Sequence, residues 1–349
     1  MSFCFNFNVP GDPAASVDFD EKELQEEKTS GKAEHIEDNT SLEDSVKEAK
    51  EHFPPSNPQL LLTDSVFETV TVGTLPSLLF LNETVFEKTV SEREDTEKIL
   101  SCSKEQNSDL ISGVYEGGLK VWECTYDLLE QIEKNGETFR DKTVLDLGCG
   151  AGLLGILALK RGASQVHFQD YNSTVIEQLT VPNVILNCQE DEEGDWEGDN
   201  NRKRTVEIQD KHGCEKEDEI FKPPPKKRAT DMSQHTLMRR CHFFSGNWKT
   251  FLPLILKKEP QPKFDIIFTS ETIYNTAYYP ALHEALQKLL ASNGQVYLAT
   301  KSHYFGVGGG LHLFETFVKE KEVFSLDRLW DGEEGLQRHV VVLRLKKTD

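Results

Sequence analysis

In its middle, the chain alternates short apolar runs with segments whose apolar residues recur every three or four positions. Residues 118–136 have this helical spacing and end on Gly136, a residue type that often terminates helices. A strand pattern at 143–148 follows, then a helical pattern at 153–162 and a second strand pattern at 165–170. Strands that alternate with helices in this way predict βαβ units and a largely parallel sheet, which places the chain in the α/β class.

The end of the chain breaks this alternation. Strand patterns at 323–330 and 339–346 are joined by only eight residues, too few for a helical crossover. We therefore expect these two strands to be antiparallel neighbours. A dinucleotide-binding fold closes with another parallel unit, so this feature argues against such a fold.

Composition divides the chain into a tail, an extension and a main domain. Residues 1–53 are acidic with few apolar positions, so we expect a disordered tail. Residues 54–110 are rich in Val, Thr and Phe and predict a small N-terminal extension of one or two β-hairpins. Residues 111–349 form the main domain, which a charged stretch at 189–239 interrupts as a disordered insertion.

Charge and cysteine content narrow the class of protein. The formal net charge of -21 disfavours direct binding of nucleic acid and favours basic partners. The seven cysteines form no C-x-x-C pair, which is typical of a reducing compartment rather than of disulfides or a zinc site. The chain lacks an apolar run of membrane-span length and a signal-peptide pattern. We therefore expect a soluble, intracellular protein with no membrane partner.

The stretch "VLDLGCGAGLLG" (144–155) fits two cofactor signatures. As G-x-G-x-x-G, it matches the turn that approaches a pyrophosphate. As D-x-G-x-G-x-G, it begins at Asp146 and continues through Gly148, Gly150 and Gly152. The carboxylate can hold an ammonium group, while the helix start receives a carboxylate, and the same acid would repel a pyrophosphate. The loop therefore favours S-adenosylmethionine.

Polar residues after the next two strands extend this prediction. Asp170 ends a strand about 20 residues after the glycine loop, where a carboxylate accepts both hydroxyls of a ribose. Tyr171 could flank the sugar or the base. Gly246, Asn247 and Trp248 follow a later strand, where an amide can pair with the adenine edge and an indole can pack on its face.

A polar cluster at the end of a further apolar strand marks the expected position of the transferred methyl group, on the crevice side of the sheet. Its members are Ser270, Glu271, Thr272, Tyr274 and Asn275. The same residues could also cap the following helix. Residues 301–310 indicate a lip of the substrate pocket, and His303 has no second His or Cys at ligand spacing, so we expect no metal site.

A basic cluster inside the insertion predicts a nuclear localisation signal that binds an import receptor. Its residues are Lys222, Lys226, Lys227 and Arg228. The alternative is that these charges merely solvate an acidic insertion.

Six stretches together resemble protein-histidine methyltransferases of the seven-stranded class: "GVYEGGLKVWE", "VLDLGCGAGLLG", "HFQDYN", "SGNW", "TSETIYN" and "KSHYFGVGGG". The resemblance covers residues 111–349 apart from the insertion. It implies a Rossmann-like seven-stranded sheet with an antiparallel last strand and S-adenosylmethionine as the methyl donor. It also implies a large-subunit ribosomal protein as acceptor, an effect on ribosome assembly or translation, and residence in the nucleus, nucleolus and cytoplasm.

The resemblance further implies which residues line the cofactor site. They are Trp122, Glu123, Cys124, Thr125, Gly148, Gln169, Asp170, Tyr171, Gly246, Asn247, Trp248 and Ser270. One departure stands out, because relatives that modify lysine carry Asp-x-x-Tyr where this chain has Glu271 and Tyr274.

The resulting hypothesis is an in-line transfer of a methyl group to an imidazole nitrogen. A neutral imidazole, with a pKa of about 6.5, has a free lone pair, so orientation matters more than a strong base. Glu271 is the candidate acceptor for the N–H of the other ring nitrogen, and Tyr274 walls the pocket. Two alternatives stay open: lysine methylation by the same fold, and a cofactor-holding ribosome-assembly or chaperone-binding module. A third, a nicotinamide oxidoreductase, rests only on the G-x-G-x-x-G match and has no second mononucleotide-binding half to support it.

Overall fold

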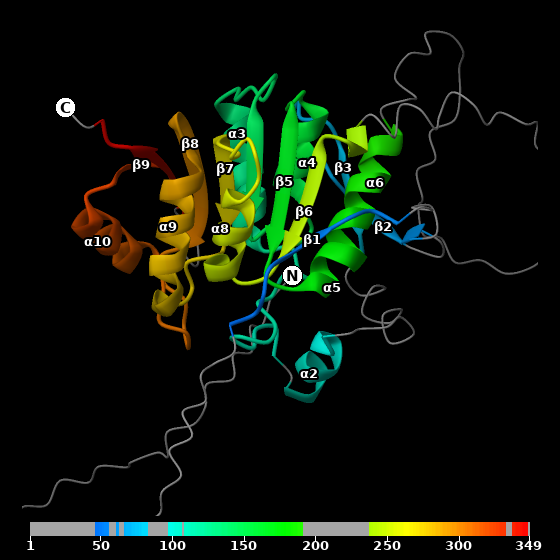
Figure 1. The fold of residues 1–349 in the computed structure, drawn as a ribbon, viewed down its shortest axis with the longest axis horizontal. Helices are drawn as coiled ribbons and strands as arrows, with labels where there is room; N and C mark the ends of the chain where they lie inside the picture. Colours follow the sequence, from blue (N-terminus) through cyan, green and yellow to red (C-terminus); the bar gives the residue numbers. More distant parts are fainter. Residues whose placement is uncertain are drawn as a thin grey trace, which may run out of the picture.

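A single eight-stranded sheet organises the protein, in the order β1-β6-β5-β4-β7-β8-β10-β9 (Figure 1). The computed structural model describes residues 46–55, 61–62, 66–82, 97–106, 108–190, 237–332 and 337–347. The strands of the sheet are β1 (Lys50–His52), β4 (Thr143–Leu147), β5 (Gln165–Asp170), β6 (Cys241–Ser245), β7 (Phe264–Ser270), β8 (Leu290–Lys301), β9 (Phe324–Asp331) and β10 (Arg338–Leu345).

The five strands β6, β5, β4, β7 and β8 are parallel to one another. Strand β10 lies between β8 and β9 and is antiparallel to both. The α/β class and the antiparallel closing pair are therefore confirmed. The short connection between β9 and β10 is the reason, because it leaves no room for a crossover helix.

Helices cover both faces of the sheet. They are α3 (Glu123–Lys134), α4 (Leu153–Lys160), α5 (Ser173–Val175), the π-helix η3 (Ile176–Thr180), α6 (Val181–Glu190), α8 (Trp248–Leu256), the 3-10 helix η4 (Thr276–Tyr278), α9 (Tyr279–Leu289) and α10 (Leu311–Lys321). Val144 of β4 packs with α3, α4 and α6, whereas its neighbour Leu145 packs with α8, α9 and α10. This alternation shows why the central strands are apolar throughout: both of their faces are buried.

The sheet has one strand more than the predicted seven. Strand β1 pairs antiparallel with the edge strand β6, although its residues fall in the predicted tail. The buried His52 shares hydrogen bonds with Ser245 Oγ (2.7 Å) and Glu177 Oε1 (2.8 Å), which anchor the strand. The polar composition of this segment gave no indication of a strand, because backbone pairing at a sheet edge needs no apolar run.

The extension contains a hairpin and a helix. Strands β2 (Phe67–Val70) and β3 (Leu78–Leu81) are antiparallel, and α2 (Ile99–Gln106) is a helix that the sequence pattern did not predict. The N–H groups of Leu79 and Leu81 donate to Asn187 Oδ1 (3.0 Å) and Asn183 Oδ1 (2.9 Å), which fixes the hairpin on α6.

The predicted tail and insertion fall largely outside the described residues. Helix α6 continues to Glu190 and residues 237–239 precede β6, so the structure describes five residues of the expected insertion. Residues 1–45 and 191–236, which include the basic cluster, lie outside the described part. Within the described ranges, no helix has the length and apolar character to cross a membrane.

Candidate active site

A cavity of about 590 Å³ lies at the carboxyl ends of β4, β5, β6 and β7. Ligands of open α/β sheets bind at this edge, so the fold itself selects the position. Most of the residues predicted from the sequence line this cavity. They are Trp122, Thr125, Gly148, Gly150, Asp170, Tyr171, Gly246, Asn247, Trp248, Ser270, Glu271 and Tyr274.

The glycine loop turns the chain sharply from β4 into α4. Its Gly148 and Cys149 N–H groups both donate to Gln169 O at 2.8 Å, and Gly150 N–H donates to Asp170 Oδ2 at 2.9 Å. A pyrophosphate cradle needs such N–H groups for its ligand, and here they are used within the protein. Gly152, at φ 77°, precedes α4 and lies outside the cavity lining.

Close approach explains the glycine at position 150. Its φ of 49° is in the left-handed region, and an added Cβ would lie 3.0 Å from Gly118 O. The loop therefore packs against the backbone of the segment before α3. Together the two segments form the floor of the cavity.

Asp146 does not line the cavity. It is 2% exposed and accepts a hydrogen bond from Gly155 N (2.9 Å), which ties β4 to α4. Burial raises the pKa of Asp146 to about 8. Side chains alternate along a strand, so Asp146 points with Val144 toward the α4 face. The predicted contact of this carboxylate with an ammonium group is therefore not supported by its position.

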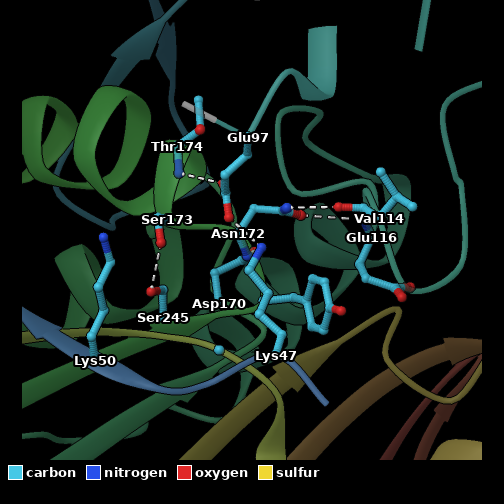
Figure 2. Close-up of polar contacts among 12 residues, drawn as sticks. Lys47, Lys50, Glu97, Val114, Glu116, Asp170, Asn172, Ser173, Thr174 and Ser245 are labelled. Carbon is cyan, nitrogen blue, oxygen red and sulfur yellow. Dashed lines mark hydrogen bonds and ion pairs between the residues drawn. The ribbon is translucent and has the colours of Figure 1, made fainter. Parts of the chain in front are cut away.

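Asp170, unlike Asp146, lines the cavity. Its carboxylate also accepts a hydrogen bond from Asn172 N (3.2 Å), and burial raises its pKa to about 6. Figure 2 shows Asp170 at the end of β5, with Lys47 and Glu97 close by. A carboxylate that backbone N–H groups hold at the carboxyl end of this strand is suited to bind the hydroxyls of a ribose.

The residues after β6 form another wall through a chain of hydrogen bonds. The buried Gln169 donates from Nε2 to Gly246 O (2.9 Å) and accepts from Trp248 Nε1 (2.9 Å). Gln169 therefore positions the wall without lining the cavity. The Asn247 side chain accepts from Lys249 N (2.9 Å), so it caps α8 as well as lining the cavity.

The segment before and within α3 divides into two groups. Trp122 lines the cavity and donates from Nε1 to Gly117 O (3.0 Å), and Thr125 Oγ1 donates to Ser270 Oγ (3.1 Å). Glu123 and Cys124 lie behind this wall, because Cys124 is fully buried and Glu123 pairs with Lys301 (3.1 Å).

The predicted catalytic pair, Glu271 and Tyr274, lines the cavity at the end of β7. Glu271 has a φ of 59°, an uncommon conformation for a residue with a side chain, which often marks functional sites. Its carboxylate accepts a hydrogen bond from Tyr304 Oη and lies 3.6 Å from Lys301 Nζ. The roles of Glu271 and Tyr274 stay predictions.

The lining residues that the sequence analysis missed include Lys47, Glu116, Gly118 and Tyr278. Lys47 precedes β1, where the polar composition gave no signal. Its ammonium group pairs with Glu97 (Figure 2) and lies 4.5 Å from the ring centre of Tyr171. Glu116 and Gly118 belong to "GVYEGGLKVWE", a stretch that was used only for the family resemblance. Its acidic residue followed directly by two glycines is a signal that could have marked it as part of the site.

These features fit S-adenosylmethionine better than a dinucleotide. Asp170 suits its ribose, and the N–H groups of Gly148, Cys149 and Gly150, which a phosphate would need, donate within the protein instead. No cluster of three His, Cys, Asp or Glu residues able to hold a metal ion occurs in the described part of the chain.

Comparison with known proteins also indicates a methyltransferase. A family model described as "Methyltransferase domain" matches residues 123–329. The chain is 45% identical over 305 residues to the histidine protein methyltransferase 1 homolog of Bos taurus, covering 86% of this chain and 74% of the relative. It is 37% identical over 254 residues to the Dictyostelium discoideum homolog, covering 72% and 64% of the two chains.

A solved structure is also similar, the N-methyltransferase NodS from Bradyrhizobium japonicum WM9 in complex with S-adenosyl-l-homocysteine. It has 14% identity and a TM-score of 0.36, with 64% of this chain and 85% of that chain covered. From the family model and the curated relatives, the chain belongs to the histidine protein methyltransferase family, enzymes that use S-adenosylmethionine to methylate histidine in proteins.

Proposed function

We propose that this enzyme methylates a histidine of a basic large-subunit ribosomal protein and thereby affects ribosome assembly or translation. The observation that carries the proposal is the formal net charge of -21. Ribosomal proteins that contact RNA are basic, so an acidic enzyme attracts them at long range, and salt weakens that attraction. The acids that line the cavity extend this charge to the site itself.

The chemistry asks for positioning rather than strong base catalysis. When bound, S-adenosylmethionine supplies a methyl group on a positively charged sulfur. Asp170, Trp122 and the Gly246–Trp248 wall would hold this cofactor, while residues at the end of β7 face the acceptor. A histidine with an ordinary pKa near 6.5 is largely neutral at physiological pH, so its lone pair is available without a base.

Lysine as the acceptor makes a different kinetic prediction. An ammonium group must lose a proton first, so a lysine methyltransferase gains activity steeply up to pH 9 or 10, near the lysine pKa of about 10.4. Histidine methylation instead reaches its plateau within roughly two units above the imidazole pKa of about 6.5. The pH profile therefore separates the two acceptors independently of product analysis.

We propose residence in the nucleus, including the nucleolus, as well as in the cytoplasm. The support is the basic cluster Lys222, Lys226, Lys227 and Arg228, which lies outside the described residues. Such a cluster fits an import receptor. Replacing Lys226 and Lys227 by Ala in a fluorescent fusion should reduce its nuclear fraction, and an unchanged distribution would contradict the assignment.

The acceptor is tested with extract from cells that lack the enzyme. Purified enzyme and methyl-labelled S-adenosylmethionine are added, and the labelled peptide is identified by mass spectrometry. Label on a histidine of a large-subunit ribosomal protein is the expected result, with Asp170→Ala as the inactive control. Label on a histidine of another protein overturns the ribosomal assignment, and label confined to lysine overturns the acceptor type.

A further inference from the structure

Glu116 faces the cavity from the segment that precedes α3. It lies opposite the residues that follow β7, and its carboxylate reaches two of them. Tyr274 Oη donates to Glu116 Oε2, and Tyr278 Oη donates to Glu116 Oε1 at 2.9 Å. We call Glu116, Tyr274 and Tyr278 the Glu116 cluster.

All the hydrogen-bond donors to this carboxylate are neutral. Besides the two tyrosine hydroxyls, Gly113 N–H donates to Glu116 Oε1 at 2.6 Å. Among the residues that the structure describes, no Lys, Arg or His forms an ion pair with Glu116. The carboxylate is thus well oriented, but its negative charge is not matched by a neighbouring cation within contact distance.

The partial burial of Glu116 affects both its pKa and the strength of its interaction with a positive charge. Desolvation raises the pKa of Glu116 above its ordinary value, while the two tyrosines, Gly113 and the more distant charge of Lys47 act to lower it. A carboxylate shielded from water interacts more strongly with a positive charge that forms beside it. The Glu116 cluster is therefore suited to a reaction in which the substrate becomes cationic.

Glu271 differs in this respect, although it lines the same cavity. Lys301 Nζ lies 3.6 Å from its Oε1, and the same ammonium group lies 3.1 Å from Glu123 Oε2. The other oxygen of Glu271 accepts from Tyr304 Oη. The Glu271 carboxylate thus has a neighbouring cation and a hydroxyl donor to Oε2, whereas its Oε1 accepts no hydrogen bond from the described part of the chain.

The tyrosines of the Glu116 cluster also have a shape suited to a small flat ring. The rings of Tyr274 and Tyr278 stand perpendicular, with centres 5.8 Å apart and an interplanar angle of 90°. Aromatic faces and edges of this kind pack favourably against a planar heterocycle. Charge and shape therefore point to the same occupant.

We propose that Glu116 is a catalytic residue that accepts the N–H of the acceptor imidazole and stabilises the imidazolium formed by methyl transfer. The lone pair of one ring nitrogen forms the new N–C bond, and the S–C electron pair stays on sulfur. The ring becomes an N-methylimidazolium, whose remaining N–H proton passes to Glu116 and then to solvent. This assigns to Glu116 the role that the sequence suggested for Glu271.

The test compares Glu116→Gln, Glu116→Asp and Glu271→Gln with a matched control, Glu284→Gln, which alters an exposed glutamate on α9. Each variant is given labelled S-adenosylmethionine at saturation and extract from cells lacking the enzyme. Labelled methylhistidine is measured after acid hydrolysis of total protein. Binding of S-adenosylhomocysteine is measured separately by calorimetry.

We expect Glu116→Gln to slow methylhistidine formation at least about tenfold, because it keeps the shape and removes the charge. Its affinity for S-adenosylhomocysteine should stay within about twofold of wild type. Glu116→Asp, which keeps the charge, should recover part of the rate, and Glu284→Gln should match wild type. Glu271→Gln should lose less rate than Glu116→Gln.

Three outcomes would overturn the proposal. These are an unchanged rate in Glu116→Gln, a parallel loss of cofactor affinity, and equal inactivity of the Gln and Asp variants, which would indicate a packing role. The readout counts methylhistidine in all proteins, so it does not depend on the ribosomal assignment. A wrong acceptor protein would move the label to another protein without changing the order of the variants.

Discussion

The backbone N–H of Gly150 donates a 2.9 Å hydrogen bond to Asp170 Oδ2. This contact joins the turn after β4 to the end of β5, two segments that each belong to a separate cofactor motif. It also aims the carboxylate into the cavity, where Gly118 leaves room: a Cβ there would lie 2.9 Å from Asp170 Oδ1. The two motifs therefore act as one unit.

We predict that Asp170→Asn lowers affinity for S-adenosylhomocysteine at least about tenfold, since a charged acceptor in a cavity binds hydroxyls more strongly than an amide. The pKa of Asp170 is about 6, so affinity in the wild type should fall as the pH drops through 6 and the carboxylate protonates. Calorimetry at pH 5 and pH 7.5 measures both effects. A variant with the wild-type pH dependence would contradict this role.

Asp146→Asn should affect stability rather than binding. The pKa of Asp146 rises from 3.8 to about 8 on folding, so the folded protein binds this proton more tightly than the unfolded chain. The free energy of unfolding of the wild type should therefore decrease as the pH rises from about 4 to about 8. Asp146→Asn, which has no proton to lose at this position, should not show the part of the decrease that Asp146 causes.

Urea unfolding at pH 5 and pH 8.5 is the measurement for Asp146→Asn, because linkage predicts that the variant gains relative stability at the higher pH. Its affinity for S-adenosylhomocysteine should stay within about threefold of wild type, since the side chain does not line the cavity. A large loss of affinity for S-adenosylhomocysteine would contradict this expectation and support the contact between Asp146 and the ammonium group that the glycine motif suggested.

The sequence predicted those parts of the site that follow strands of the parallel sheet. Asp170, Trp248 and Glu271 come just after, or at the end of, apolar strands, and such positions meet at one edge of a sheet. The D-x-G-x-G-x-G motif did not indicate which face of β4 the Asp146 side chain occupies. One residue of register decides whether a strand side chain faces the ligand or the helix behind the strand.

Lys47 and Glu116 could not be predicted in the same way. Both lie on segments whose position depends on contacts far along the chain, such as the pairing of β1 with β6 and the bonds of Glu116 to Tyr274 and Tyr278. Local periodicity does not encode such contacts. The extra strand at the sheet edge was missed for the same reason.

We predict that Lys47→Ala weakens S-adenosylhomocysteine binding by roughly three- to tenfold, because the lysine lines the cavity and holds Glu97 and the Tyr171 ring together. Lys50→Ala is the matched control, since Lys50 (Figure 2) lies on the same segment but makes an exposed ion pair with Glu177, which has an N–O distance of 3.5 Å. Equal affinities of the two variants would argue against a specific role for Lys47.

Gly246→Ala should detach β1 from the sheet. An added Cβ would lie 2.4 Å from Ala49 Cα, which is backbone and cannot rotate away. Gly308→Ala is the control: its φ of 79° is also positive, but nothing lies within 4 Å of its Cβ, so only the strain of the backbone, about 1 kcal/mol, applies.

The expected result is a loss of thermal stability in Gly246→Ala that exceeds the loss in Gly308→Ala by about 1 to 3 kcal/mol, typical of a forced overlap. Proteolysis should then cut near residues 46–52 in Gly246→Ala alone, because the edge strand has lost its partner. Binding of S-adenosylhomocysteine should weaken with it, since Lys47 lines the cavity and Asn247 N–H donates to Lys47 O at 3.2 Å. If Gly246→Ala were no less stable than Gly308→Ala, the segment that contains Lys47 and β1 would not be the part of the fold that completes the cofactor site.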